Sequence, residues 1–269
     1  MILITGATGN VGGQVAAGLA DLEPRRLSRS ASGPGAVAGD LTDLELMEKA
    51  LDGVDRVFLL WPMAPAPLAE PLVDLLSRRV ERVVFLSTLT IAAGLDDDIT
   101  RTHAELERMI DESGLARTFI RASGFATNLL WEAHAIKSGV VRKPFGAAGR
   151  SLVHEHDLGA VAAQALRDDA YAGTELVVTG PEAVTQRRQI ELIAEATGRP
   201  IRWEELSQDA AHAEMVGAGW DPTMAADLLD YYGSLVEAPE PVTSTVADVT
   251  GVPARSFRQW AQDHADAFR

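Results

Sequence analysis

Short apolar runs alternate with amphipathic segments along the first 122 residues of the chain. The apolar runs have the length of buried strands, and the segments between them repeat apolar residues at helical spacing. The predicted strands are Met1–Thr5, Pro24–Ser28, Ala36–Gly39, Arg56–Trp61, Arg82–Ser87 and Ala116–Arg121, and the predicted helices are Val11–Leu22, Asp43–Leu51, Leu68–Arg79 and Thr102–Glu112. Such alternation predicts an α/β fold, a doubly wound parallel sheet of the Rossmann type with helices on both faces.

The pattern changes after about residue 123. Two further strands are predicted, at Glu175–Thr179 and Pro200–Glu204, and the rest of the C-terminal part has mainly helical spacing. A stretch rich in glycine and basic residues from Ala133 to Ser151 is expected to form a long connection on the substrate side.

The length of 269 residues suits one large domain, or a large domain with a smaller lobe. We expect a dinucleotide-binding Rossmann domain over residues 1–150 and a smaller, mostly helical C-terminal lobe over residues 170–269 on the substrate side. A helix at about residues 156–168 is expected to pack back on the first domain.

A glycine-rich segment lies where the first predicted strand meets the first predicted helix. It reads Thr5-Gly6-Ala7-Thr8-Gly9-Asn10-Val11-Gly12, a G-x-x-G-x-x-G pattern. The first glycine permits a tight turn, the second lets backbone approach a pyrophosphate, and the third lets the helix pack closely on the sheet. The helix N-terminus then offers free N–H groups and its positive dipole end to the phosphates. The segment predicts a dinucleotide site formed by Gly6, Thr8, Gly9, Asn10, Val11 and Gly12, with a glycine turn that binds nothing as the alternative.

The residues at the end of the second predicted strand indicate whether the chain binds NADP or NAD. An acidic residue at this place would bind the ribose 2′-hydroxyl of NAD. The chain instead has Arg25-Arg26-Leu27-Ser28-Arg29-Ser30. Arg29 with Ser28 would attract a 2′-phosphate by a charge-assisted hydrogen bond, and Arg25 replaces Arg29 if the strand register differs. We therefore predict NADPH as the cofactor, with NAD as the alternative and solvated surface arginines as the other interpretation.

Several segments spread along the chain resemble the NmrA-like branch of the atypical short-chain dehydrogenases. The matching segments are Ile4–Gly9, Gly39–Asp43, Val57–Pro62, His103–Glu107, Ser113–Leu115, Thr118–Arg121, Thr179–Glu182 and Thr197–Pro200. The resemblance implies that Asp40 faces the adenine amine and that Leu41 lies against the adenine ring. It also implies that Leu60, Trp61 and Pro62 line the cofactor.

Further cofactor contacts are expected where later strands end, because ligands of a doubly wound sheet lie beyond the carboxyl ends of its strands. Ser87 and Thr88 offer hydroxyls there to the nicotinamide ribose or to a substrate oxygen, with capping of a turn as the alternative. The resemblance implies that His103 contacts the ribose or the nicotinamide and that the backbone around Ala122 lies near the nicotinamide.

The segment after the sixth strand is expected on the substrate side. The resemblance implies that Phe125 and Asn128 line the substrate pocket, with core packing as the alternative for Phe125, and His154 is a third pocket candidate. His154, His156 and Asp157 look like a metal cluster, but histidines two residues apart on a strand point to opposite faces. Asp157 is interpreted as the N-cap of the following helix. No metal site is therefore expected.

The catalytic pair typical of the wider superfamily is missing. Ordinary members carry Tyr-x-x-x-Lys on the helix after strand 5, where the tyrosine donates a proton. Aligned through Glu107, the lysine position falls on His103 and the tyrosine position on Ile99, which has no ionisable group. The catalytic residue therefore stays unknown. His103 is a candidate because histidine titrates near neutral pH, Ser87 is a second candidate, and a surface pairing of His103 with Glu107 is the alternative.

The missing tyrosine changes the predicted reaction. A quinone accepts hydride when the two rings are held in contact, and water supplies the proton. An aldehyde or ketone needs a donor or another stabiliser for the growing alkoxide. We therefore predict an NADPH-dependent oxidoreductase that reduces a quinone-like or other conjugated acceptor by direct hydride transfer. The alternatives are a non-catalytic NAD(P)-binding redox sensor with a protein partner and a tailoring reductase of aromatic secondary metabolites.

Charge and composition argue against one class of partner and exclude several kinds of chemistry. A net charge of −15 disfavours nucleic acid as the main partner. The absence of cysteine excludes disulfides, thiolate metal sites and a cysteine nucleophile. The sequence has no charged leader with an apolar core and no run of about eighteen apolar residues. We expect a cytoplasmic monomer or homodimer without a membrane segment.

Overall fold

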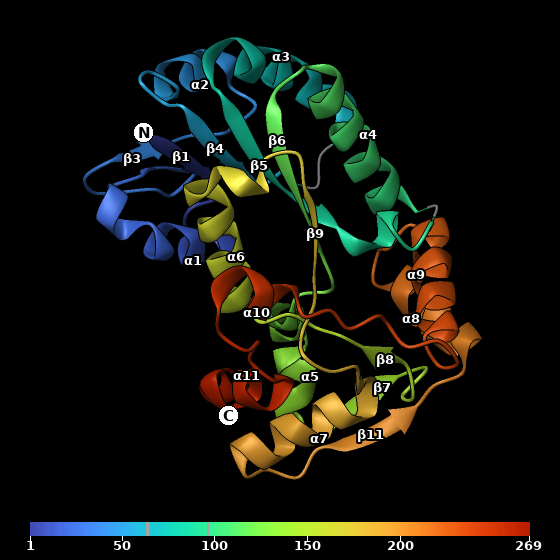
Figure 1. Cartoon of the computed structure of the whole chain (residues 1–269). Coiled ribbons are helices and arrows are strands. Elements are labelled where there is room, and N and C mark those ends of the chain that lie inside the picture. Colours follow the sequence, from blue (N-terminus) through green and yellow to red (C-terminus); the bar gives the residue numbers. More distant parts are fainter. Residues whose placement is uncertain (63–64, 96) are drawn as a thin grey trace. The chain divides into compact units, whose positions relative to one another are not determined.

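The computed structural model describes residues 1–62, 65–95 and 97–269. The chain divides into two compact units. Figure 1 shows the whole chain, coloured along the sequence from blue to red. The first unit consists of Met1–Ala122, Glu155–Val178 and Thr245–Val252. The second unit consists of Ser123–His154, Thr179–Ser244 and Pro253–Arg269. The two units therefore interleave along the sequence, and the helix expected near residues 156–168 belongs to the first.

The first unit contains a seven-stranded sheet in which all strands run parallel. Its spatial order is β3 (Ala36–Ala38), β2 (Arg25–Ser28), β1 (Ile2–Thr5), β4 (Arg56–Leu59), β5 (Arg82–Thr88), β6 (Ala116–Ala122) and β9 (Glu175–Val178). The order reverses at β1, which pairs with β2 on one side and with β4 on the other. The predicted Rossmann-type sheet is thus confirmed, and ligands of such sheets lie beyond the strand ends next to this reversal.

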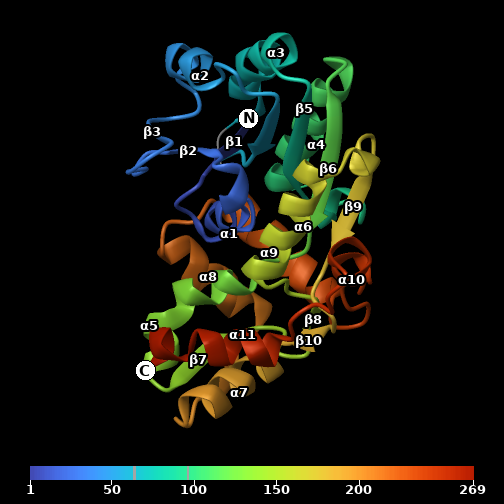
Figure 2. The ribbon, with the colours of Figure 1, turned by 60° about the vertical axis from the view of Figure 1, so that its left-hand side comes forward.

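Helices cover both faces of this sheet (Figures 1 and 2). One face packs on α2 (Leu44–Ala50), α3 (Glu70–Arg79) and α4 (Asp98–Glu112) through an apolar cluster that includes Val57, Phe85 and Leu106. The other face carries α1 (Asn10–Gly18) and α6 (Glu155–Arg167), with α10 (Thr245–Thr250) packed on α6. The two helices α1 and α6 approach closely, since a Cβ on Gly159 would lie 2.4 Å from Cβ of Gln14.

The second unit is built from helices and two small sheets. Strand β7 (Val140–Lys143) pairs in parallel with β11 (Arg202–Glu205), and β8 (Gly149–Arg150) pairs antiparallel with β10 (Val184–Thr185). Its helices are α5 (Ala133–Lys137), α7 (Gln186–Thr197), α8 (Gln208–Gly217), α9 (Pro222–Ser234) and α11 (Phe257–Asp263). Its core includes Ile193, Phe257, Trp260 and Phe268. Among the described residues of either unit, no helix is long and apolar enough to span a membrane.

Some local expectations are wrong. Residues 133–151 do not form one long connection but contain α5, β7 and β8, because β7 finds its hydrogen-bond partner in β11, about sixty residues later. Helix α6 begins at Glu155, so Asp157 lies in its first turn and is not the N-cap. Its carboxylate there still faces the positive end of the helix dipole.

The two histidines near the start of α6 do not lie on a strand as expected. His154 precedes α6 and His156 lies in its first turn. Within residues 1–62, 65–95 and 97–269, no group of three or more His, Cys, Asp or Glu side chains is placed to hold a metal ion. Helix α4 also starts at Asp98, earlier than predicted, because the Asp97 carboxylate caps it by accepting the Thr100 N–H at 2.9 Å.

Candidate functional site

The carboxyl ends of β1, β4, β5 and β6 share one edge of the sheet, since these strands run parallel. Thr5 links the first two of these ends. Its Oγ1 accepts the N–H of Leu60 at 2.8 Å and donates to the carbonyl of Phe58 at 3.1 Å. The residues just before the glycine loop are therefore fixed to the end of β4, where the strand order reverses.

The loop after β1 has the tight backbone that its glycines predict. Gly6 has a φ of 64°, in the left-handed region that favours glycine. The Gly9 N–H donates to the Gly6 carbonyl at 2.9 Å. Gly12 packs so closely on the same peptide that a Cβ there would lie 2.2 Å from Gly6 O and 2.6 Å from Gly6 C. The shape of the loop therefore requires glycine at both Gly6 and Gly12.

The first turn of α1 has N–H groups that no side chain caps. Gly9 is the N-cap and has no side chain that could accept these N–H groups, and the first turn contains no acidic residue. Helices α2 and α4, by contrast, are capped by the carboxylates of Asp43 and Asp97. Asn10, like the two residues before it, is exposed. An anion here would receive N–H bonds and lie at the positive end of the helix dipole, so the loop fits a pyrophosphate.

Hydroxyl groups and a cation lie together at the end of β2. Thr8 Oγ1 donates to Ser28 Oγ at 3.0 Å and lies 3.1 Å from Ser30 Oγ. The Arg29 guanidinium is exposed and has no hydrogen bond or ion pair with any residue that the structure describes. Ser30 lies in the turn after β2 and was not predicted as a site residue. Its place directly after the end of the strand, two residues from Ser28, was the available signal.

Arg25 and Asp40 have defined partners. The Arg25 guanidinium donates to the carbonyls of Ala50 and Asp52, at the end of α2, at 2.5 and 3.0 Å. Arg25, the alternative candidate for binding the 2′-phosphate, therefore uses its guanidinium for hydrogen bonds within the protein. The exposed Asp40 carboxylate accepts the N–H and the hydroxyl of Thr42 at 3.0 and 2.9 Å. These two hydrogen bonds, with a smaller contribution from Arg29, hold the pKa of Asp40 below its usual value.

The three residues after β4 face different surroundings. Leu60 lies beside the glycine loop, where a Cβ on Gly6 would be 3.5 Å from its Cδ1. Trp61 is only 5% exposed and belongs to the apolar cluster on the α3 side of the sheet, as does the buried Leu41. Pro62 is exposed. The side chain of Leu60 therefore lies against the loop.

Two hydroxyl residues end β5, and only one of them is satisfied. Thr88 Oγ1 accepts the Thr90 N–H at 3.3 Å and caps the turn that follows the strand. Ser87 is 4% exposed, and its Oγ has no hydrogen-bond partner among the described residues. A buried polar group without a partner destabilises a fold by about 1–3 kcal/mol. Ser87 is therefore the kind of group that a bound ligand would satisfy. Ala122, opposite Thr88 in the sheet register, is buried.

His103 lies on α4 with its ring stacked on Phe85 of β5, at 5.8 Å between centroids and 23° between planes. Its Nδ1 lies 2.8 Å from the carbonyl oxygen of Ile99. Because a carbonyl only accepts, Nδ1 carries the hydrogen and Nε2 of the neutral ring carries the lone pair. Burial is the main cause that lowers the pKa of His103. His103 therefore offers a ligand an accepting nitrogen, which does not favour the role of proton donor.

A buried ion pair anchors α4 to the sheet one turn after His103. Arg121 Nε and Nη2 donate to the two carboxylate oxygens of Glu107 at 3.1 and 2.6 Å, and Glu107 is 7% exposed in its side chain. Arg121 also pairs with Glu175 at 2.5 Å. The spacing of His103 and Glu107 on the helix had left a pairing of these two residues open as an alternative. The hydrogen-bonding partner of Glu107 is instead Arg121.

We expect His103 to titrate below the ordinary histidine pKa of about 6.5. The folded protein favours the neutral ring, so the stabilisation is complete above this pH and is lost as the pH falls towards the lowered pKa. The ring resonances of the six histidines are to be followed by NMR between pH 5 and 8, with His103 assigned from the His103→Gln variant. A titration midpoint of His103 at or above the ordinary histidine pKa would contradict the burial of its neutral ring.

The three predicted substrate-pocket residues lie in the second unit. Phe125 forms a parallel bridge with Val153, which brings it beside the residue that precedes His154. His154 is 5% exposed, and its Nε2 lies 3.4 Å from Asp263 Oδ2. Asn128 is exposed on the 3-10 helix Ala126–Glu132. Phe125 is therefore paired with the residue next to His154, whereas Asn128 is exposed.

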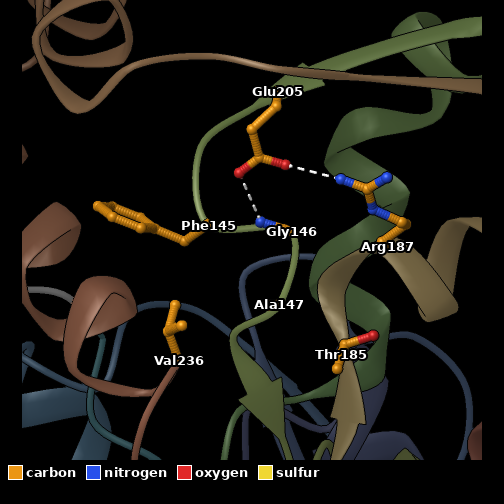
Figure 3. A pocket seen from close by; sticks show the side chains of 7 residues that line it. All are labelled: Phe145, Gly146, Ala147, Thr185, Arg187, Glu205 and Val236. Carbon is orange, nitrogen blue, oxygen red and sulfur yellow. Dashed lines mark hydrogen bonds and ion pairs between the residues drawn. The ribbon is translucent and has the colours of Figure 1, made fainter.

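The second unit also has an open cavity of about 510 Å³ that no sequence pattern predicted. Its lining residues are Phe145, Gly146, Ala147, Thr185, Arg187, Glu205 and Val236. Figure 3 shows Arg187 and Glu205 joined across one wall and the apolar side chains of Phe145 and Val236 on the other. Phe145 has a φ of 58°, and Glu205 fixes this turn by accepting the Gly146 N–H at 2.9 Å. The polar groups of the wall thus satisfy one another.

Comparison with known proteins finds one family and several reductases or oxidoreductases that are similar to this chain. Residues 1–229 match the NmrA-like family. The chain is 37% identical to a (4-alkanoyl-5-oxo-2,5-dihydrofuran-3-yl)methyl phosphate reductase of Streptomyces griseus, with 100% of this chain and 99% of the relative covered. It is 32% identical to an NAD(P)H azoreductase of Xenophilus azovorans, with the same coverage. Among solved structures, an NADPH-dependent quinone oxidoreductase of Escherichia coli in complex with NADPH superimposes with a TM-score of 0.83 at 22% identity, over 98% of this chain and 99% of that one.

Proposed function

The chain belongs to the NmrA-like family, and from this premise we propose that it is an NADPH-dependent reductase that transfers hydride directly to a conjugated acceptor. The observation that carries the proposal is the uncapped start of α1 over the Gly6–Gly12 loop, which fits a pyrophosphate. The orphan hydroxyl of Ser87 at the same edge of the sheet supports a ligand that extends along the strand ends.

The acceptor class follows from chemistry that three proteins similar to this chain share. One is named for a 5-oxo-2,5-dihydrofuran, one for azo compounds and one for quinones. A 5-oxo-2,5-dihydrofuran is an unsaturated lactone, so all three names describe a double bond in conjugation. Such a bond takes a hydride at one end while the charge spreads to the other. The protein then has mainly to hold the rings in contact, which is consistent with Ile99 at the usual tyrosine position.

The proposed roles of the residues follow their positions in the first unit. The nicotinamide of a bound dinucleotide supplies the hydride. The loop from Gly6 to Gly12 holds the pyrophosphate, and Asp40 with Leu41 contacts the adenine. Leu60, Ser87, Thr88, His103 and Ala122 line the nicotinamide end, where the Nε2 lone pair of His103 accepts a hydrogen bond from a ribose hydroxyl. We further propose that Phe125, Asn128 and His154 contact the acceptor, whose proton comes from water.

The proposal is tested by titrating the purified protein with NADPH and with NADH and following nicotinamide fluorescence. Menadione, an azo dye and 2(5H)-furanone are then added, and loss of absorbance at the nicotinamide band is recorded. NADPH binding with acceptor-dependent oxidation is the expected result. Binding without oxidation of any acceptor would replace the enzyme by a non-catalytic sensor. Failure to bind either nucleotide would overturn the whole proposal.

Replacing Arg29 with alanine is expected to weaken NADPH binding about 10-fold to 100-fold and to leave NADH binding unchanged. A hydrogen bond to a charged group contributes about 1.5–3 kcal/mol, and only NADPH has the 2′-phosphate to receive it. Dissociation constants for both nucleotides are measured on the Arg29→Ala variant. Arg78→Ala, which removes one exposed cation on α3, is the control for net charge. Equal losses for the two nucleotides would mean that Arg29 does not select NADPH.

A further inference from the structure

A buried charge pair with two tyrosines lies in the second unit. Arg150 Nε donates to Glu240 Oε1 at 2.8 Å, and the side chains are 14% and 2% exposed. Glu240 also accepts the Ser151 N–H at 2.8 Å and the Tyr231 hydroxyl at 2.5 Å. The guanidinium carbon of Arg150 lies 5.0 Å from the ring centroid of Tyr232. The carboxylate of Glu240 is therefore surrounded by donors, and its charge balances that of Arg150.

Two donors of this cluster remain unused. Arg150 Nη1 donates to the hydroxyl oxygen of Tyr232 at 2.6 Å, so the phenolic hydrogen points to another acceptor. Among the described residues, no side chain or carbonyl accepts that hydrogen, and Arg150 Nη2 has no partner either. Both groups belong to residues that are partly exposed. The Tyr232 hydroxyl accepts its hydrogen bond from Nη1, and Nη1 and Nη2 belong to the same planar guanidinium group. The two unused donors, the Tyr232 hydroxyl and Arg150 Nη2, are therefore neighbours.

The backbone beside the guanidinium is kept clear by glycine. A Cβ on Gly124 would lie 2.1 Å from Arg150 Nη2 and 2.9 Å from its Cζ. Gly124 directly precedes Phe125, one of the residues that we assign to the acceptor. Any larger residue at position 124 would displace the guanidinium and with it the Tyr232 hydroxyl.

We propose that Tyr232 and Arg150 Nη2 together bind an oxygen of the acceptor, and this inference rests on the proposed function. Because Glu240 already neutralises Arg150, the pair suits a polarised but uncharged oxygen, such as the carbonyl of a quinone or of an unsaturated lactone. The guanidinium polarises the phenol by donating to its oxygen, and this strengthens the hydrogen bond that the phenol donates. Tyr232 thus becomes a substrate-binding residue supplied by α9.

The neighbouring Tyr231 provides a matched control, because its hydroxyl has an acceptor within the protein and that of Tyr232 has none among the described residues. Its hydroxyl donates inward to Glu240, and burial together with the nearby Glu240 carboxylate raises the pKa of the Tyr231 phenol. Removing this hydroxyl removes a hydrogen bond internal to the protein, whereas removing that of Tyr232 removes a donor for which the described residues offer no acceptor. The two Tyr→Phe variants therefore differ by the direction of a single hydroxyl.

The test uses the full chain labelled with [13Cζ]tyrosine, which gives three signals because the chain has three tyrosines. Each signal is assigned from the Tyr171→Phe, Tyr231→Phe and Tyr232→Phe variants. Menadione and 2(5H)-furanone are the probes, added without nucleotide and then with NADPH. We expect saturable displacement of the Tyr232 signal, with those of Tyr171 and Tyr231 unmoved. Tyr232→Phe is expected to raise the dissociation constant of menadione about fivefold, the effect of one hydrogen bond.

The outcomes separate this inference from the proposed function. A Tyr232 signal that neither probe moves, or a Tyr231→Phe variant that loses as much affinity as Tyr232→Phe, would overturn the binding role. If NADPH is oxidised by menadione with an unchanged KM in Tyr232→Phe, the reductase proposal stands and the inference falls. If the Tyr232 signal moves but no acceptor is reduced, the binding site stands and the reductase proposal falls.

Discussion

Replacing Gly12 with alanine is expected to abolish detectable binding of NADPH and to lower the stability of the protein. The added Cβ would lie 2.2 Å from the carbonyl oxygen of Gly6, and a backbone atom cannot rotate away as a side chain does. Either the loop or α1 has to move, and overpacking of this kind costs about 1–3 kcal/mol. Movement would also misalign the N–H groups at the start of α1, so we expect a loss of affinity above about 100-fold, measured by nicotinamide fluorescence titration.

The adjacent glycine is the matched control for this variant. A Cβ on Gly13 would meet only the carbonyl of Ala7, at an ordinary 3.7 Å. Because Gly13 lies inside α1, Gly13→Ala is expected to keep NADPH affinity and to raise stability by up to about 1 kcal/mol. Equal NADPH binding by the two variants would mean that the loop does not hold the dinucleotide.

The variant Glu240→Leu is expected to lower the free energy of unfolding by about 3–5 kcal/mol, because it leaves the Arg150 cation buried without its partner. Unfolding by urea is followed by circular dichroism. Glu237→Leu, three residues earlier and exposed, is the control and is expected to change stability little. The double variant Arg150→Met/Glu240→Leu should recover much of the loss, since no uncompensated charge remains. A Glu240→Leu protein as stable as the control would mean that the pair is dispensable to the fold.

Features that depend on neighbouring residues in the chain could be predicted from the sequence. The first eighteen residues contain the strand from Ile2 to Thr5, the glycine loop and α1. The shape of the loop follows from its glycines. The parallel sheet was equally accessible, because its buried strands appear as apolar runs between helical patterns. Ser87 could be placed at the edge of the sheet because it falls at the end of such a run.

The remaining features depend on contacts between distant segments, which leave no periodic signal. Arg150 and Glu240 are 90 positions apart, and nothing near either residue indicates its partner. The short strands β8 and β10 have two residues each, too few to show alternation. The side chain of Arg25 could not be excluded as a phosphate anchor until its hydrogen bonds to the end of α2 were seen. The partner of Glu107 was hidden for the same reason, since the spacing on one helix, which left pairing with His103 open as an alternative, does not reveal Arg121 on a strand.

The interleaving of the two units has a consequence for how the protein is made. A ribosome releases β1 to β6 first, but α6, which covers the sheet face next to α1, follows only after residues 123–154 of the second unit. The edge strand β9 comes later still, and α10 emerges last of these elements. Until then, the nascent chain presents an apolar sheet face and an unpaired strand edge, features that promote aggregation. Neither unit can be produced by a single truncation, so expression of one unit alone requires permuted or spliced segments. Overproduction of the whole chain should benefit from slow synthesis or from chaperones.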